Sequence, residues 1–228
     1  MSQLQQGYAV ANRTELELIE LLEELQVSSL QNQLTELYSK TYTEGHLGGP
    51  YEWQEEFHNA GRYYRERAII AGNRVGKTRT AAAEVAMHLT GYYPSWWKGR
   101  QFTEATDWIV AAPTNELCRD ILQQALVGGM REGEKAPDGT GWIPSNSIVD
   151  YGWRQCGVPN VMDTIRVKHT SGRTSLCTFK SYEQGPVKFQ GVARDGVWLD
   201  EEPTDYEIYT ESLTRTLDKN GLVIFSRT

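Results

Sequence analysis

Cysteine is scarce in this sequence of 228 residues, and its three cysteines lie far apart. Cys118, Cys156 and Cys177 form no C-x-x-C pair, which excludes a disulfide scaffold and a cysteine zinc site. No uninterrupted apolar run approaches the roughly 18 residues that a membrane-spanning helix needs. Residues 1–6 have neither a basic nor an apolar stretch, so no secretion signal is expected. These absences predict a protein of a reduced, cytosolic compartment without a membrane partner.

Acidic residues outnumber basic ones, 30 to 23, but the charges are unevenly placed. Residues 1–60 hold 10 of the acids, and their only bases are Arg13 and Lys40. In contrast, residues 61–100 have 8 bases to 2 acids, and residues 154–194 have 7 to 2. A basic stretch of this kind is usually a solvated surface, with contact to nucleic acid as the alternative.

Length and a hydrophobic share of 39% predict one globular domain with an N-terminal extension. We place the extension, a helical segment and linker, at residues 1–44 and the domain at residues 45–228. Residues 14–38 carry leucines at helical spacing after a capping box, which predicts an amphipathic helix. That helix would pack on the domain or on a partner. The glycines and proline of residues 41–50 predict a linker.

After residue 51 the sequence alternates between short apolar runs and helical patterns. The expected elements are strands at 67–71, 107–111, 196–199 and 222–225, a hairpin at 162–169 and 173–179, and helices at 78–89, 113–126 and 207–217. Such alternation predicts an α/β fold with a mostly parallel sheet that helices cover on both faces. The aromatic cluster at residues 92–97 favours core or interface packing over base stacking.

The sharpest motif is Ala-Gly-Asn-Arg-Val-Gly-Lys-Thr at residues 71–78, between an expected strand and an expected helix. Its glycines and the helix N-terminus offer a polyphosphate the inward-pointing N–H groups that it needs. Lys77 would reach the β- and γ-phosphates, and Thr78 would ligate Mg²⁺. The strict pattern has glycine at position 71, where this chain has Ala71. The candidate ATP-binding residues here are Gly72, Asn73, Arg74, Val75, Gly76, Lys77, Thr78 and Arg79.

A second motif, Val-Trp-Leu-Asp-Glu-Glu-Pro at residues 197–203, ends an expected strand in carboxylates. Asp200 would hold Mg²⁺ through water, and Glu201 would orient and deprotonate the attacking water. Glu202 is a spare carboxylate, a salt-bridge partner or of no special role. The long interval from Thr78 to Asp200 leaves room for an additional strand between the two motif strands. That insertion is found in ATPases that carry a catalytic Glu beside the metal-binding Asp.

Gln54 lies upstream of the loop strand and is a candidate for reading adenine. A glutamine amide both donates and accepts hydrogen bonds, as the edge of adenine requires. The alternative, which is compatible with that role, is a helix that buries Trp53 and Phe57 on the sheet.

An arginine can stabilise the charge that develops on a phosphoryl group during its transfer. Arg74, within the loop, is the candidate supplied by the same chain, and its alternative role is a structural ion pair with a neighbouring carboxylate. Arg194 and Arg79 are less well placed by sequence. The sequence does not decide between these roles.

These motifs resemble the large terminase subunit of tailed bacteriophages, the ATP-driven motor that packages DNA. The resemblance covers roughly residues 45–228. It rests on Gln54 with its aromatic neighbours and on residues 71–78, 110–114, 189–191, 198–203 and 224–228.

The resemblance implies a P-loop NTPase of the RecA-like (ASCE) type, with Mg²⁺ as cofactor and ATP as substrate. It also implies that Ser226 and Thr228 belong to a coupling motif that senses the γ-phosphate. In the family a nuclease domain follows, built on a later carboxylate cluster. Because this chain has no such cluster, we expect a fragment that comprises the ATPase domain, without nuclease activity.

The implied partners are double-stranded DNA, the portal protein and a small terminase subunit that selects the DNA. The implied assembly is a homo-oligomeric ring on the procapsid, in the host cell cytoplasm and transiently at the portal vertex.

Two other functions stay open. A DExx-type helicase or translocase fragment shares the Asp-Glu-Glu-Pro box, but a helicase needs a second RecA-like domain that this length does not hold. A nucleotide-switched assembly module without turnover would have no need of Glu201.

Overall fold

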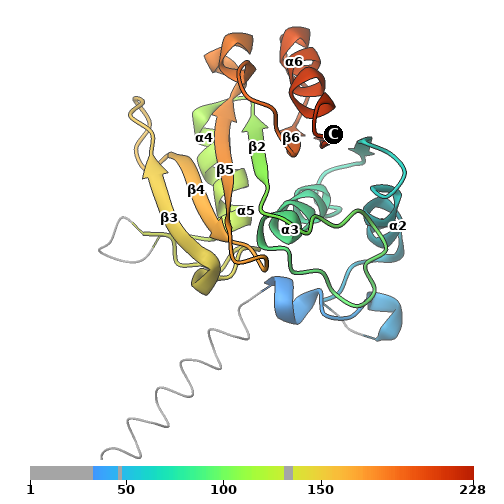
Figure 1. Cartoon of the computed structure of the whole chain (residues 1–228). Helices are drawn as coiled ribbons and strands as arrows, with labels where there is room; N and C mark the ends of the chain where they lie inside the picture. The colour runs from blue at the N-terminus through green and yellow to red at the C-terminus, as the bar shows by residue number, and fades with distance from the viewer. Residues whose placement is uncertain (1–32, 46–47, 131–135) are drawn as a thin grey trace, which may run out of the picture.

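The computed structural model describes residues 33–45, 48–130 and 136–228 (Figure 1). Most of the proposed extension, and with it most of the helix expected at residues 14–38, lies outside the described residues. The last part of that helix, Gln33–Leu37, is described and forms a π-helical turn. No helix within the described ranges is long and apolar enough to cross a membrane.

A seven-stranded sheet in the order β1-β7-β6-β2-β5-β4-β3 forms the centre of the fold. Strands β1, β7, β6, β2 and β5 run parallel, whereas β4 and β3 extend the sheet in antiparallel pairing. The strands are β1 (Glu66–Ile70), β2 (Asp107–Ala112), β3 (Ile148–Trp153), β4 (Met162–Lys168), β5 (Thr174–Ser181), β6 (Gly196–Asp200) and β7 (Leu222–Arg227). Because five strands run the same way, the residues that follow them meet at one edge of the sheet, the carboxyl edge.

Helices cover both faces of the parallel part of the sheet (Figure 1). The helical segments are α2 (Glu52–Ala60), α3 (Lys77–Thr90), α4 (Asn115–Leu117), a π-helical stretch (Cys118–Gln123), α5 (Gln124–Val127) and α6 (Tyr206–Leu217). One face carries α3 and the continuous run from α4 to α5, and the other face carries α6. Helix α2 packs beside β1.

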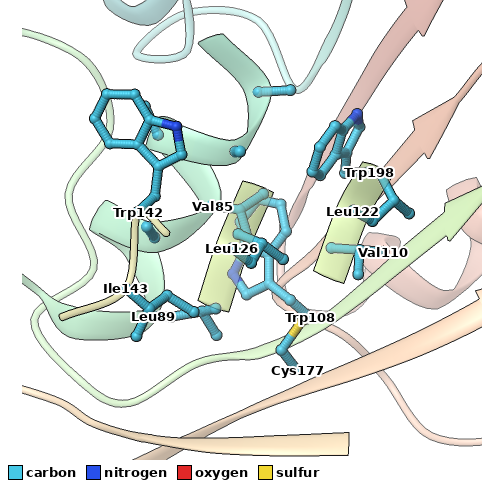
Figure 2. Close-up of a cluster of buried hydrophobic side chains, with 14 of the residues drawn as sticks. Val85, Leu89, Trp108, Val110, Leu122, Leu126, Trp142, Ile143, Cys177 and Trp198 are labelled. Atoms are coloured by element: carbon cyan, nitrogen blue, oxygen red, sulfur yellow. The ribbon is translucent and has the colours of Figure 1, made fainter. Parts of the chain in front are cut away.

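The larger core lies between the sheet and α3 (Figure 2). Trp108 of β2 and Trp198 of β6 are fully buried there and face Val85 of α3 and Leu122 of the π-helical stretch. Helix α3 also buries a run of alanines at 81–83, each wholly inaccessible to solvent. Small side chains let two backbones approach closely, so α3 lies tight on the sheet and its first turn is held firmly at the carboxyl edge.

The expected α/β fold class is confirmed, and every strand and helix expected after residue 51 is present within a few residues of its predicted bounds. Among the described strands, the alternation pattern missed the edge strand β3. An additional strand does separate the two motif strands β1 and β6, but it is β7, which follows Asp200 in sequence. The residues between Thr78 and Asp200 supply β2 to β5, all on the far side of β6.

Within the aromatic cluster at residues 92–97, Trp96 and Trp97 pack in the core, whereas Tyr92 is exposed. Trp96 and Trp97 are almost fully buried, and their rings lie 5.9 Å apart between centroids. The ring of Trp97 also lies 5.2 Å from that of His58 on α2. This contact packs the loop after α3 against α2.

Candidate functional site

A pocket of about 580 Å³ opens at the carboxyl edge of the sheet, at the N-terminus of α3. Its lining comes from the loop and first turn of α3 (Asn73, Arg74, Gly76, Lys77, Thr78 and Arg79), from the ends of β6 and β7 (Asp200, Glu201 and Thr228), and from Pro113, Leu117 and Ile121. The two motifs that sequence places far apart therefore face one cavity, whose volume is in the range of small-molecule sites.

The loop between β1 and α3 contains two residues with a left-handed backbone conformation, Arg74 and Gly76. Gly76, just before α3, has φ +97°, a left-handed backbone that glycine adopts without strain. Arg74 has φ +62°, which is uncommon for a residue with a side chain. The loop thus leads directly into the N-terminus of α3, where the backbone N–H groups and helix dipole favour an anion.

Lys77 lies almost buried at the floor of the pocket. Its ammonium donates to the carbonyl oxygens of Ala71 (2.7 Å) and Gly72 (2.9 Å). A third contact, 3.3 Å long, reaches the hydroxyl of Thr228 at the end of β7. The ammonium is therefore held between the loop and the neighbouring strand, on the side where a bound phosphate would lie.

Asp200 ends β6 and is only 7% exposed. Burial raises its pKa to about 6, an effect that the Glu201 charge reinforces and the Ser226 hydroxyl opposes. Ser226 Oγ donates to Asp200 Oδ1 at 2.6 Å and accepts from Trp198 Nε1 at 2.9 Å. This chain of two hydrogen bonds fixes the orientation of the carboxylate toward the pocket.

Glu201 follows Asp200 in a left-handed conformation, with φ +60°. Its N–H donates to the carbonyl oxygen of Ser226 at 2.7 Å. Its carboxylate accepts from the Thr228 hydroxyl (3.0 Å) and from the Thr228 N–H (3.3 Å). Glu202 points elsewhere and pairs with Arg227 at 2.6 Å, so it is a salt-bridge partner outside the pocket.

Arg74 is exposed, lines the pocket and forms no ion pair with any residue in the described part of the chain. Arg79 also lines the pocket, but its guanidinium donates to Gly48 O at 2.6 Å and lies over the Trp142 ring. Arg194 pairs with Asp107 at the start of β2, at the edge of the sheet opposite the pocket. Of the three arginines, only Arg74 lines the pocket without a hydrogen bond, ion pair or ring contact to another described residue.

Gln54 does not line the pocket and is 1% exposed. Its amide nitrogen donates to Thr80 Oγ1 at 2.6 Å, and its amide oxygen accepts from Tyr51 N at 2.9 Å, as a cap of α2. A Cβ atom on Gly76 would lie 3.3 Å from this amide nitrogen. Gln54 thus supports the loop from below, and its adenine role stays a prediction. Trp53 is more than one-third exposed, so the expected burial of that ring is wrong.

A buried ionic cluster lies beneath the loop and joins α2, β1 and α3. Glu84 of α3 is fully buried and accepts from Arg67 of β1, from His58 Nδ1 (2.8 Å) and from His88 Nε2 (3.3 Å). Burial alone would raise the pKa of Glu84, but the Arg67 charge and these hydrogen bonds hold it well below its ordinary value. Burial lowers the pKa of both histidines. The cluster fixes the strand and the helix that flank the loop.

Sequence reasoning missed two residues that hold the segment carrying the motif carboxylates. Trp198 donates to Ser226 Oγ, and Tyr182 donates to the carbonyl oxygen of Asp200 at the end of β6. Trp198 belongs to the motif at residues 197–203. Its indole N–H, a hydrogen-bond donor that needs a partner when buried, was the signal available in the sequence. Nothing in the sequence near Tyr182 connects it to Asp200, because the sheet order alone brings them together.

Residues 68–228 match a protein-family model described as "Terminase large subunit, T4likevirus-type, N-terminal". The large terminase subunit of Salmonella phage P22 is 37% identical over an alignment of 228 positions, which covers 91% of this chain and 42% of that protein. The chain therefore spans less than half the length of this relative.

Two solved structures share the fold. The ATPase domain of the Thermus phage P74-26 large terminase has a TM-score of 0.53 at 17% identity, over 80% of this chain and 66% of that one. The large terminase of another thermophilic bacteriophage has a TM-score of 0.51 at 12% identity, over 78% of this chain and 39% of that one. At such identities the likeness supports the fold alone.

Proposed function

This chain belongs to the terminase large-subunit family, and from that premise we propose that it hydrolyses Mg-ATP to move double-stranded DNA into a procapsid. The observation that carries the proposal is the meeting of Lys77, Asp200, Glu201 and Thr228 at one pocket on the carboxyl edge. A lysine and a helix N-terminus favour a polyphosphate, and a nearby carboxylate favours its hydrolysis.

The triphosphate would lie along the loop, with its oxygens at the N–H groups of residues 72–78 and at Lys77. The Lys77 ammonium, which donates to the carbonyl oxygens of Ala71 and Gly72, would bind the β- and γ-phosphates. Arg74, exposed and unpaired among the described residues, would approach the γ-phosphate from the open side of the pocket. The N-terminal turn of α3 adds its dipole to these charges.

The Thr78 hydroxyl and the Asp200 carboxylate would hold a magnesium ion, and both residues line the pocket. No group of three or more metal-binding side chains exists among the described residues, so the phosphates would supply further oxygen ligands, as is usual for this ion. When bound, Mg²⁺ neutralises charge on the phosphate oxygens. Ser226 keeps the Asp200 carboxylate turned to that position.

Glu201 is the proposed base. Its carboxylate is held at the pocket by Thr228, the last residue of the coupling segment. It would accept a proton from a water molecule placed for attack on the γ-phosphorus atom. As the bond between the γ-phosphorus atom and the bridging oxygen breaks and ADP leaves, Lys77 and Arg74 would stabilise the negative charge.

We further propose residues 45–228 as the ATPase domain and residues 1–44 as its extension. Family membership supports a homo-oligomeric ring that contacts the portal protein and the small terminase subunit. It also supports a location in the host cell cytoplasm and, transiently, at the portal vertex. Each of these is a proposal for the longer protein, since the chain spans 42% of its phage P22 relative.

The test is the steady-state release of phosphate from ATP with Mg²⁺ and with EDTA. We expect turnover that requires Mg²⁺ and disappears in Lys77→Ala, whereas the exposed Lys98→Ala variant retains it. ATP binding without turnover in the wild-type chain would contradict the proposal and favour a nucleotide-switched assembly module.

A further inference from the structure

Tyr182 connects three strand ends at the carboxyl edge. It follows directly after β5, and its side chain is 5% exposed. Its ring packs in the smaller core under α6 and lies 6.5 Å from the ring of Phe189. Since β2 lies between β5 and β6 in the sheet, the side chain reaches across the end of β2 to the end of β6.

The Tyr182 hydroxyl lies at the backbone of the motif carboxylates. It is 2.9 Å from Asp200 O, 3.0 Å from Glu201 O and 3.4 Å from Ala111 O. A phenol has one proton to donate, so the two shorter contacts share it. A tyrosine hydroxyl has an ordinary pKa of about 10, so at neutral pH it is protonated and acts as a donor.

The backbone at Glu201 needs such support. A left-handed φ is unfavourable for a residue with a side chain and persists only where the surroundings hold it. Two hydrogen bonds hold the backbone of this residue, one from its N–H to Ser226 O at 2.7 Å and one to its carbonyl oxygen from Tyr182. The direction of its Cα–Cβ bond, and so the place of its carboxylate, depends on both.

We propose that Tyr182 is a positioning residue, which holds the Asp200–Glu201 backbone so that the Glu201 carboxylate faces the pocket. The expected effect of Tyr182 on the rate of hydrolysis rests on the proposed function. Its effect on the backbone rests on the hydrogen bonds alone. The ring of Tyr182 packs near that of Phe189, and its hydroxyl makes the hydrogen bonds to the backbone.

The matched pair of variants is Tyr182→Phe and Tyr209→Phe. Each removes one tyrosine hydroxyl from the α6 side of the sheet, but that of Tyr209 bonds to Glu66, outside the pocket. We expect Tyr182→Phe to lower kcat about tenfold with KM for ATP unchanged, and Tyr209→Phe to leave both unchanged. An unchanged kcat in Tyr182→Phe, or a loss of ATP affinity equal to the loss of rate, would overturn the proposal.

Amide hydrogen exchange tests the same inference without turnover. In Tyr182→Phe we expect exchange in the peptide 199–203 to become about tenfold faster, while exchange in α3 stays as in the wild type. Equal acceleration in α3 would mean general destabilisation and would overturn the positioning role. If the wild-type chain does not hydrolyse ATP but this local change occurs, the proposed function fails and the positioning role stands.

Discussion

The hydroxyl of Thr228 lies 3.0 Å from the carboxylate of Glu201, although 27 positions separate the two residues in sequence. The same hydroxyl accepts from Lys77 at 3.3 Å. It also lies 3.2 Å from the Asn73 amide oxygen, and with one proton it donates to only one of the two oxygens. The end of β7 is therefore in contact with the phosphate-binding loop and with the proposed base at once.

Replacing Thr228 with valine should lower kcat about tenfold. The variant keeps the shape of the side chain but removes a hydrogen bond to a charged group, worth roughly 1.5 kcal/mol. Thr228→Ser retains the hydroxyl and should stay within twofold of wild type. The measurement is phosphate release at saturating ATP, and equal rates in the valine and serine variants would contradict the role of the hydroxyl.

Glu201→Gln should reduce turnover by about 10²–10⁴-fold while ATP still binds, because an amide cannot take the proton from water. The matched control is Glu202→Gln, since the Glu202 carboxylate pairs with Arg227 outside the pocket. Phosphate release and the binding of a fluorescent ATP analogue are measured in parallel. Turnover that survives in Glu201→Gln would reject Glu201 as the base.

Much of the fold follows from sequence because its signals are local. The run of residues 107–112 is apolar after its first residue, as a strand buried on both faces requires, and the glycines at 72 and 76 interrupt the chain where the loop bends. The edge strand β3 has Asp150 and Gly152 at alternate positions, and only its pairing with β4 makes it a strand.

The motif residues of the site were predictable, but their contacts were not. Chain order does not tell which strand lies between β1 and β6, so the contact of Thr228 with both motifs depends on the place of β7. For the same reason the hydrogen bond from Tyr182 to Asp200 has no local signature. The amide of Gln54 is buried against Thr80, a partner that the spacing of α2 alone does not reveal.

Arg74→Ala should lower kcat by about 10³-fold or more if this arginine stabilises the transferred phosphoryl group in its own chain. The exposed, unpaired state of Arg74 among the described residues supports that role. Arg194→Ala, at the opposite edge of the sheet, is the control and should keep the wild-type rate. The rate per monomer should also be constant across a wide range of protein concentration. A rate that rises with concentration would mean that a neighbouring chain supplies the arginine.

The contribution of His58 and His88 to stability should fall as the pH drops below about 6.5. Burial holds the pKa of His58 and His88 below the ordinary 6.5, so the unfolded chain binds protons that the folded chain does not. Between the folded and unfolded pKa values, each histidine removes about 1.4 kcal/mol of unfolding free energy per pH unit. Urea unfolding at pH 7.5 and 5.5 measures the loss. His58→Gln should show a smaller difference between the two pH values than wild type, and an identical difference would contradict this account.

Gln54→Leu distinguishes support of the loop from recognition of adenine. The variant keeps the approximate size but removes the hydrogen bonds to Thr80 and Tyr51, leaving a buried hydroxyl without its donor. Because the amide is buried and committed to these partners, we expect a loss of about 1–3 kcal/mol of stability with the preference for ATP over GTP unchanged. Chemical denaturation gives the stability, and competition between the two nucleotides gives the preference. A preference that collapses while stability holds would instead assign Gln54 to adenine, and would require its side chain to turn out of the contact with Thr80 when nucleotide binds.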